Sequence, residues 1–82
     1  MTLYEGETGQ IYSVRELSME EGLTRRLQAL GLNEGTRVRI LNRKKKGSLI
    51  LSVRGTRLAV GKHITTHIEV EKQAEQEEKA GE

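Results

Sequence analysis

Apolar residues at every second position constrain the fold of this chain more than any other feature. Val38 and Ile40 alternate with Arg37 and Arg39, and residues 49–54 repeat the alternation. Such alternation places the apolar side chains on one face of a β-strand. Residues 9–14, 57–60 and 67–71 are also β-prone, and glycine-rich turns separate these segments. The spacing predicts a mostly β fold, a small barrel of about five short strands.

The core of such a barrel has to be built from aliphatic side chains. The chain has 82 residues, which is enough for one domain, and its aromatic residues are Tyr4 and Tyr12 alone. It contains no Phe, Trp, Cys or Pro. A chain of this size buries only roughly 60–65% of its unfolded surface. We therefore expect strand pairing to close the barrel and one helix to cover its mouth.

The sequence predicts that one helix between residues 18 and 31. Ser18 and Glu21 have the spacing of a capping box, and Gly31 followed by Leu32 is typical of a helix end. Gly22 is unfavourable inside a helix, and we expect the helix to pass close to a neighbouring backbone there. Four apolar residues fall on one face and should pack on the core: Met19, Leu23, Leu27 and Leu30.

Charge is divided unevenly along the chain. The stretch from Arg37 to Lys62 holds nine basic residues and no acid, whereas the stretch from Glu71 onward holds five Glu and two Lys. We expect residues 1–71 to form the folded domain and residues 72–82 to be an acidic, disordered tail. The basic stretch suits a nucleic acid, an acidic protein or a membrane surface, or is simply a solvated face.

Catalytic and metal-binding motifs are scarce. The chain has no thiol, no phosphate-binding loop and no nucleophile–base set, so we expect no enzymatic activity and no cofactor. His63 and His67 are four residues apart and are weak candidates for a transition-metal site, but the nearest carboxylate, Glu69, should face away. The N-terminus has no signal-peptide pattern and no apolar run is long enough to span a bilayer, so we expect a cytoplasmic protein.

The basic run at residues 43–46 has two interpretations: a contact for phosphate or an acidic partner, or a solvated hairpin tip. Nucleic acid is disfavoured because neither Tyr4 nor Tyr12 lies in the basic stretch of the sequence, and base stacking needs aromatic platforms. The candidate partner-binding residues combine this run with a strand face and an exposed side of the helix: Arg25, Arg26, Arg37, Arg39, Arg43, Lys44, Lys45 and Lys46.

Several segments in order resemble the FeoA family, ferrous iron transport protein A. Residues 24–41, TRRLQALGLNEGTRVRIL, are similar to its core motif, residues 51–60 and 68–70 to its ending, and residues 9–11 to its opening. Family members commonly carry two prolines around the glycine of the loop after the second strand. Here residues 44–48 keep Gly47 without the prolines. The barrel also resembles the C-terminal domain of iron-dependent repressors of the diphtheria toxin repressor type, without their helix-turn-helix.

The resemblance implies an SH3-like barrel with one inserted α-helix. It implies an accessory protein that binds the cytoplasmic part of FeoB, the membrane ferrous iron transporter with a GTP-binding domain, and supports its assembly or regulation. The family is also commonly associated with transition-metal binding. Two alternatives stay open: a small nucleic-acid-binding barrel that uses the basic hairpin, and a metal-binding regulator that uses His63 and His67. Self-association is also open.

Overall fold

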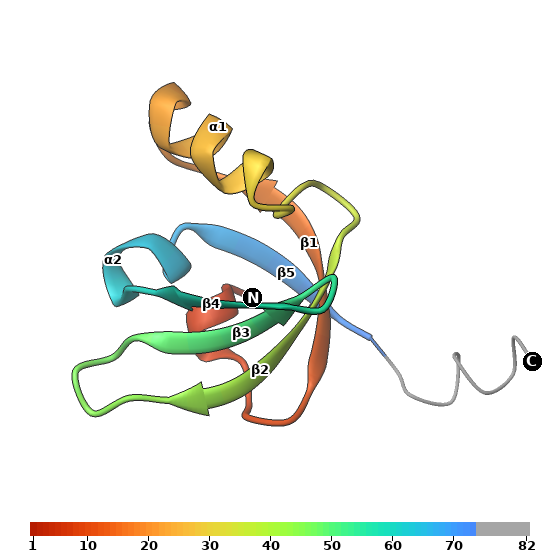
Figure 1. The fold of residues 1–82 in the computed structure, drawn as a ribbon, viewed down its shortest axis with the longest axis vertical. Coiled ribbons are helices and arrows are strands. Elements are labelled where there is room, and N and C mark those ends of the chain that lie inside the picture. Colours follow the sequence, from red (N-terminus) through yellow and green to blue (C-terminus); the bar gives the residue numbers. More distant parts are fainter. Residues whose placement is uncertain (74–82) are drawn as a thin grey trace, which may run out of the picture.

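The structure is a computed structural model that describes residues 1–73. Short strands dominate it, as the alternation predicts (Figure 1). The elements in chain order are the 3-10 turn η1 (Leu3–Glu5), β1 (Ile11–Leu17), α1 (Glu21–Ala29), β2 (Arg37–Arg43), β3 (Leu49–Val53), β4 (Thr56–Val60), the short helix α2 (Lys62–Thr65) and β5 (Ile68–Lys72). The fold is a small, mostly β, SH3-like barrel with one longer helix, which confirms the predicted fold class.

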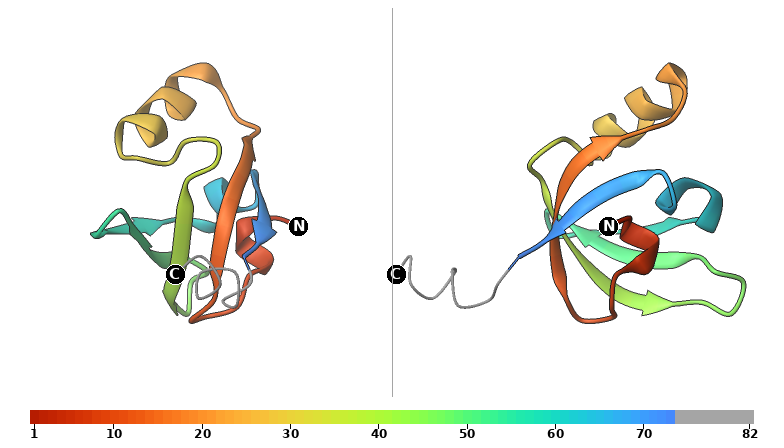
Figure 2. Two further views of the ribbon diagram at one scale, coloured as in Figure 1. Left: turned by 90° about the vertical axis from the view of Figure 1, so that its right-hand side faces the viewer. Right: turned by 180° about the vertical axis from the view of Figure 1, so that it is seen from behind.

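The five strands form one antiparallel sheet in the order β4-β3-β2-β1-β5, and the sheet curls strongly (Figure 2). The expectation that strand pairing closes the barrel is wrong, because β4 and β5 are edges that do not pair with each other. The N-terminal residues occupy the outer edge of β5 instead. The amide of Val70 donates to the carbonyl oxygen of Met1 at 2.8 Å, and Thr2 forms a bridge with Glu69.

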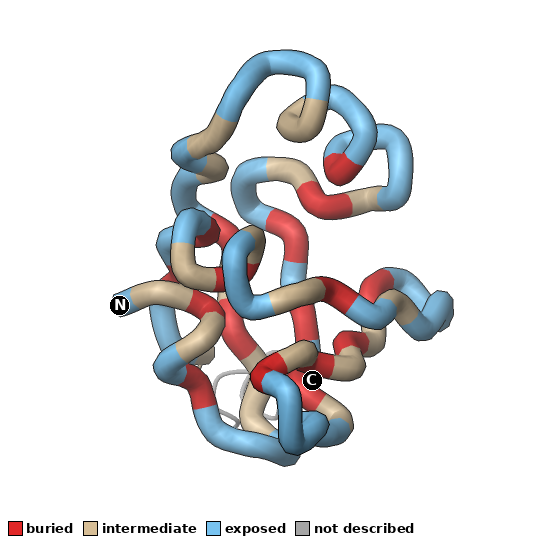
Figure 3. Tube along the Cα trace, turned by 90° about the vertical axis from the view of Figure 1, so that its left-hand side faces the viewer, coloured by how far each residue is buried: buried red, intermediate tan, exposed pale blue. Residues whose placement is uncertain are grey.

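The core sits inside the curled sheet and is almost entirely aliphatic. Figure 3 shows buried and exposed positions alternating along the strands. Tyr12 is the exception, and its hydroxyl accepts a hydrogen bond from the amide of Glu7 at 2.8 Å. Buried hydrophobic residues come from all five strands, from η1, from α1 and from the loop after α1: Leu3, Tyr12, Val14, Leu27, Leu32, Val38, Ile40, Leu49, Leu51, Val53, Val60, Ile68 and Val70.

The start of α1 differs from the prediction. The helix begins at Glu21, with Glu20 rather than Ser18 at the N-cap, and no side chain caps it. Ser18 still belongs to the end of the β1–β5 pairing, because its amide donates to the carbonyl oxygen of His67 at 2.8 Å. A capping-box contact occurs instead at η1, where the Glu5 carboxylate accepts from the amide of Thr2 at 2.7 Å.

The end of α1 follows the prediction. Gly31 has a φ of +105°, a value that favours glycine, and its amide donates to the carbonyl of Gln28 at 3.0 Å. The amide of Leu32 donates to the carbonyl of Leu27 at 2.9 Å. These two bonds form a Schellman motif. The turn directs Leu32 into the core, where it is completely buried.

The predicted apolar stripe of α1 is only partly correct. Leu27 is buried, while Met19 and Leu23 are half-buried against the core. Leu30 is 53% exposed, because it stands at the C-cap and Leu32 takes the inward position after the reversal. Gly22 also departs from expectation: an added Cβ would meet nothing within 4 Å, so no neighbouring backbone requires a glycine there.

The strand faces follow the predicted alternation. Val38 and Ile40 are buried and Arg37 and Arg39 are exposed. Residues 74–82 of the predicted disordered tail lie outside the described residues. The prediction is wrong at its first two residues, because Lys72 ends β5 and the amide of Gln73 donates to the carbonyl oxygen of Ile11 at 3.0 Å.

Candidate functional site

The basic run forms the turn between β2 and β3, and we call residues 44–48 the hairpin tip. The amide of Lys44 donates to the carbonyl oxygen of Ser48 at 2.8 Å, and the amide of Gly47 donates to the carbonyl oxygen of Lys44 at 2.9 Å. Gly47 has a φ of +98°, which suits glycine. The side chains of Lys44, Lys45 and Lys46 are exposed. The tip therefore presents three adjacent cations on a turn closed by two backbone hydrogen bonds.

Arg43, next to the hairpin tip, binds the N-terminal segment. Its Nη2 atom donates to the carbonyl oxygens of Tyr4 and Gly6, each at 2.8 Å. Its guanidinium carbon also lies 4.8 Å from the centroid of the Tyr4 ring, within the range of a cation–π contact. Arg43 was predicted to bind a partner, and the structure shows that its guanidinium already holds residues 4–6 in place.

Lys62 of α2 completes this cluster. Its Nζ atom lies 5.2 Å from the centroid of the Tyr4 ring. A Cβ added at Gly47 would lie 3.3 Å from Cβ of Lys62 and 3.7 Å from the hydroxyl of Tyr4. The expectation that Tyr4 lies apart from the basic residues is therefore wrong in three dimensions. Two cations already lie over the ring, so it is not a free platform for base stacking.

Arg37 and Arg39 lie on the outer face of β2, as predicted. Arg39 is opposite Ile11 on β1 and Ser52 on β3, and its Nη1 atom donates to the carbonyl oxygen of Gly9 at 2.9 Å. Its guanidinium is thus also tied to a backbone turn, although the side chain stays exposed.

Arg25 and Arg26 lie at the other end of the molecule. In Figure 1, α1 stands at the top of the long axis and the turn between β2 and β3 lies near the bottom. Arg25 pairs with Glu21 one helical turn earlier at 2.9 Å, and both side chains are at least 75% exposed. The structure thus separates the predicted partner-binding residues into two groups that do not form one continuous patch.

The two histidines do not form a metal centre with a third ligand. His63 lies in α2 and His67 follows that helix, so they do not share one helical face, and both are exposed. Glu69 faces outward as predicted, and its Oε2 atom lies 2.6 Å from the Met1 amino nitrogen. Within residues 1–73, no three His, Cys, Asp or Glu side chains lie close enough together to hold a metal ion.

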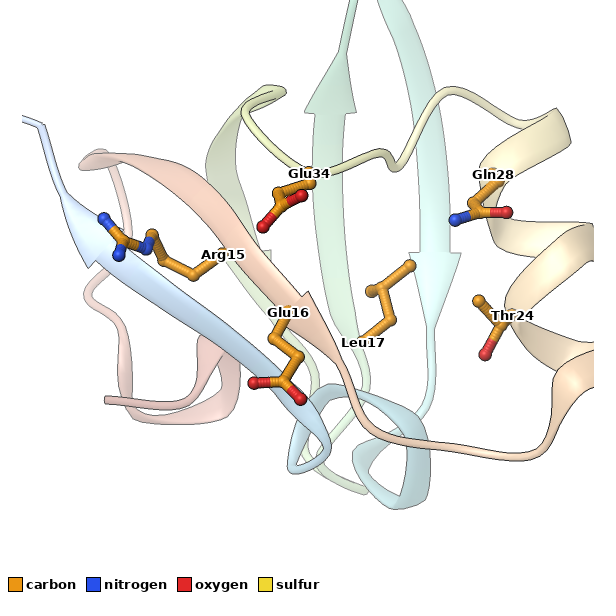
Figure 4. A pocket seen from close by; sticks show the side chains of 6 residues that line it. All are labelled: Arg15, Glu16, Leu17, Thr24, Gln28 and Glu34. Atoms are coloured by element: carbon orange, nitrogen blue, oxygen red, sulfur yellow. The ribbon is translucent and has the colours of Figure 1, made fainter.

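A small polar hollow of about 180 Å³ opens between β1 and α1 (Figure 4). The Thr24 hydroxyl there donates to the carbonyl oxygen of Glu20 at 3.0 Å, and Arg15 pairs with Glu71 at 3.1 Å. These bonds involve the hydroxyl and the guanidinium. The hollow also contains the carboxylates of Glu16 and Glu34, but no Ser, Cys or His side chain lines it. Its lining comes from three segments: Arg15, Glu16, Leu17, Thr24, Gln28 and Glu34.

A second hollow of about 590 Å³, which we call the outer groove, lies on the outside of β2, β3 and β4. Sequence reasoning missed it. The alternation that turns Arg39 outward also turns Leu41 outward, and a β-bulge between Ile40 and Asn42 brings Asn42 to the same face, opposite Ile50. Its lining is apolar at the centre and basic at the rim: Leu41, Asn42, Lys44, Ile50, Arg57, Leu58 and Ala59.

The N-terminal contribution was also missed, because Tyr4 is 39 residues from Arg43 in the chain. No local sequence pattern predicts that contact.

No helix among residues 1–73 has the length and apolar character needed to cross a membrane.

Comparison with known proteins agrees with the fold. A family model described as the FeoA domain matches residues 1–72. The solution structure of the FeoA protein from Chlorobium tepidum superposes with a TM-score of 0.85 at 27% identity, covering 90% of this chain and 71% of that one. A crystal structure of an iron uptake regulatory protein (FeoA) gives 0.82 at 27% identity, covering 89% and 97%. No curated protein matches the sequence.

Metal-dependent repressors share the barrel as part of longer chains. A manganese-dependent transcriptional repressor superposes with a TM-score of 0.81 at 20% identity, and this chain spans 36% of its length. That likeness concerns the fold alone. With the family model matching nearly the whole described chain and FeoA structures superposing over most of it, the protein belongs to the FeoA family, which is linked to ferrous iron uptake.

Proposed function

We propose that this protein is a non-enzymatic, cytoplasmic accessory protein of ferrous iron uptake that binds the cytoplasmic part of a FeoB-type transporter and supports its assembly or regulation. Family membership supports the link to iron uptake. The observation that carries the proposal is the hairpin tip, where three exposed lysines project from a turn that Arg43 and Gly47 anchor to the N-terminal segment. A rigid, acid-free surface suits recognition of an acidic protein partner.

Hydrogen bonds within the chain indicate which of the predicted partner-binding residues to test first. Of the predicted partner-binding residues, Arg39 and Arg43 donate to backbone carbonyls within the chain. Lys44, Lys45 and Lys46 are exposed and stand beyond these anchors. We therefore assign the main contact to the hairpin tip, with Arg37 and Arg39 beside it on the sheet face. Arg25 and Arg26 belong to a separate surface.

Charge reversal distinguishes the two surfaces. A variant with Lys44, Lys45 and Lys46 all changed to Glu should bind the purified cytoplasmic domain of FeoB at least tenfold more weakly, because three attractive charges become repulsive. The Arg25→Glu, Arg26→Glu variant is the matched control and should keep its affinity. Circular dichroism should show both variants folded. Unchanged binding by the triple variant would reject the hairpin tip as the contact.

A further inference from the structure

The outer groove combines features that point to a particular kind of occupant. Apolar residues from three strands line it: Leu41 and Ile50 are half-buried on the outer face of the sheet, and Leu58 lines it while also packing against the core. Arg57 and Lys44 stand at its rim, and both are exposed. An exposed aliphatic centre with a charged rim is the common arrangement of a protein-binding surface.

Charge on this face has one sign. Arg39, Ser52 and Arg57 are directly opposite one another on β2, β3 and β4. No acidic residue lines the groove, and none occurs anywhere in the chain between residues 37 and 62. An occupant with acidic side chains is therefore attracted along the whole face, whereas a basic one is repelled.

The edge of the sheet next to the groove is available for pairing. β4 is an edge strand: it pairs with β3 on one side, and no other strand of residues 1–73 pairs with its second side. A free strand edge offers backbone donors and acceptors to an extended segment, which can add to the sheet. Arg57 and Ala59 are two residues apart, so they point to the same outer side of β4.

We propose that the outer groove and the free edge of β4 bind an extended segment of a partner protein in which an acidic residue and an aliphatic residue are two positions apart. In an added strand, these two side chains face the same side. The acidic side chain then lies opposite Arg57, and the aliphatic one lies opposite Ala59, next to Ile50. The inference rests on the proposed function only in taking the occupant to be a protein.

A free peptide tests this without FeoB. The probe is Thr-Glu-Thr-Leu-Thr-Glu-Thr, blocked at both ends, which presents the acidic–aliphatic spacing in either strand direction. Titrated into the full-length ¹⁵N-labelled chain, it should shift the amides of residues 57–60, Ile50 and Ser52, and it should bind more weakly as salt is raised. The same peptide with Lys in place of Glu, and one with Ser in place of Leu, should each bind at least about tenfold more weakly.

Protein variants localise the contact. Arg57→Glu should weaken binding of the probe about tenfold or more, and Arg57→Gln should have an intermediate effect. Arg26→Glu makes the same charge change on α1 and should alter the affinity less than twofold. Arg57 is exposed and forms no ion pair with another residue of the described range 1–73, so both of its variants should fold.

Three results would overturn the proposal. The first is no amide shift at millimolar probe, and the second is equal binding of the acidic and basic peptides. The third is light scattering that reveals a dimer with the β4 amides at its contact, which would assign the groove to a second copy of the chain. Because none of these measurements involves the transporter, they leave the assignment of the hairpin tip to be judged by the FeoB experiment alone.

Discussion

The two ends of the barrel carry similar exposed cations on very different supports. At the hairpin end, Arg43 bonds two carbonyls of the N-terminal segment, and Gly47 packs on Lys62 and Tyr4. At the helix end, α1 has a single buried residue, Leu27, and Arg25 pairs only with a neighbour on its own helix. Contacts between residues distant in sequence pre-organise a charged surface. The cations of the hairpin end have such contacts, whereas Arg25 at the helix end has only a local partner.

The largest effect should come from Leu27, the most deeply buried anchor of the helix end. Leu27→Ala removes the only buried side chain of α1 and should lower the free energy of unfolding by about 2–5 kcal/mol. Leu30→Ala is the matched control on the same helix end and should change it by less than about 0.5 kcal/mol, because Leu30 is 53% exposed. Urea denaturation measures both. Equal losses for the two variants would mean that α1 is not docked through Leu27.

The next effect concerns the anchor of the hairpin end. Arg43→Ala removes both hydrogen bonds to the N-terminal segment and the contact with the Tyr4 ring, and should cost about 1–2 kcal/mol, since the side chain is partly solvated. Lys45→Ala should cost less than about 0.5 kcal/mol, because Lys45 is exposed at the tip. Thermal unfolding measures the loss of stability in both variants. If Arg43→Ala left the stability unchanged, the hairpin end would be no more firmly held than the helix end.

Glycines with similar backbone angles sharpen the comparison further. Gly47 and Gly35 have φ values of +98° and +88°, so alanine is strained at both, by about 1 kcal/mol. Only Gly47 has neighbours, with Cβ of Lys62 3.3 Å from the position of an added methyl group, whereas Gly35 faces open space. Gly47→Ala should therefore destabilise the protein more than Gly35→Ala. Identical losses in urea denaturation would show that the hairpin tip does not pack on α2.

The smallest effect is electrostatic and depends on pH. The hydrogen bond from the backbone amide of Thr2 lowers the pKa of Glu5, and the Thr2 hydroxyl acts in the same direction. Because the folded pKa is depressed, this contribution to stability is present above the ordinary Glu pKa near 4.5 and is lost as pH falls through the lowered value. Stability of the parent should thus decline more than that of Glu5→Gln on acidification. Parallel curves from pH 6 to 3 would contradict the contact.

Local sequence patterns were sufficient to predict the strands and the core of the barrel. Alternating residues such as Val38 and Ile40 identified the strands and the core, and Gly31 followed by Leu32 identified the end of α1. These features depend on residues that are close together in the sequence, so a short segment is enough to predict them. The helix start was misread at Ser18, because the β1–β5 pairing uses its amide.

The candidate site was predictable only in part. The exposed lysines of the hairpin tip follow from a basic run beside a glycine. The anchoring of Arg43 by Tyr4 and Gly6 depends on residues nearly 40 positions away. The outer groove depends on which strands pair and on a bulge that places Asn42 beside Leu41 on the outer face. Such contacts are decided by chain topology, which a residue pattern does not encode.

The central claim is that the partner contacts the hairpin end and not the helix end. The most direct measurement is a backbone amide map of the ¹⁵N-labelled protein as unlabelled cytoplasmic domain of FeoB is added. Signal loss concentrated at residues 43–48, with residues 21–29 unaffected, is the result that we predict. Signal loss confined to residues 21–29 would contradict the account and move the contact to Arg25 and Arg26.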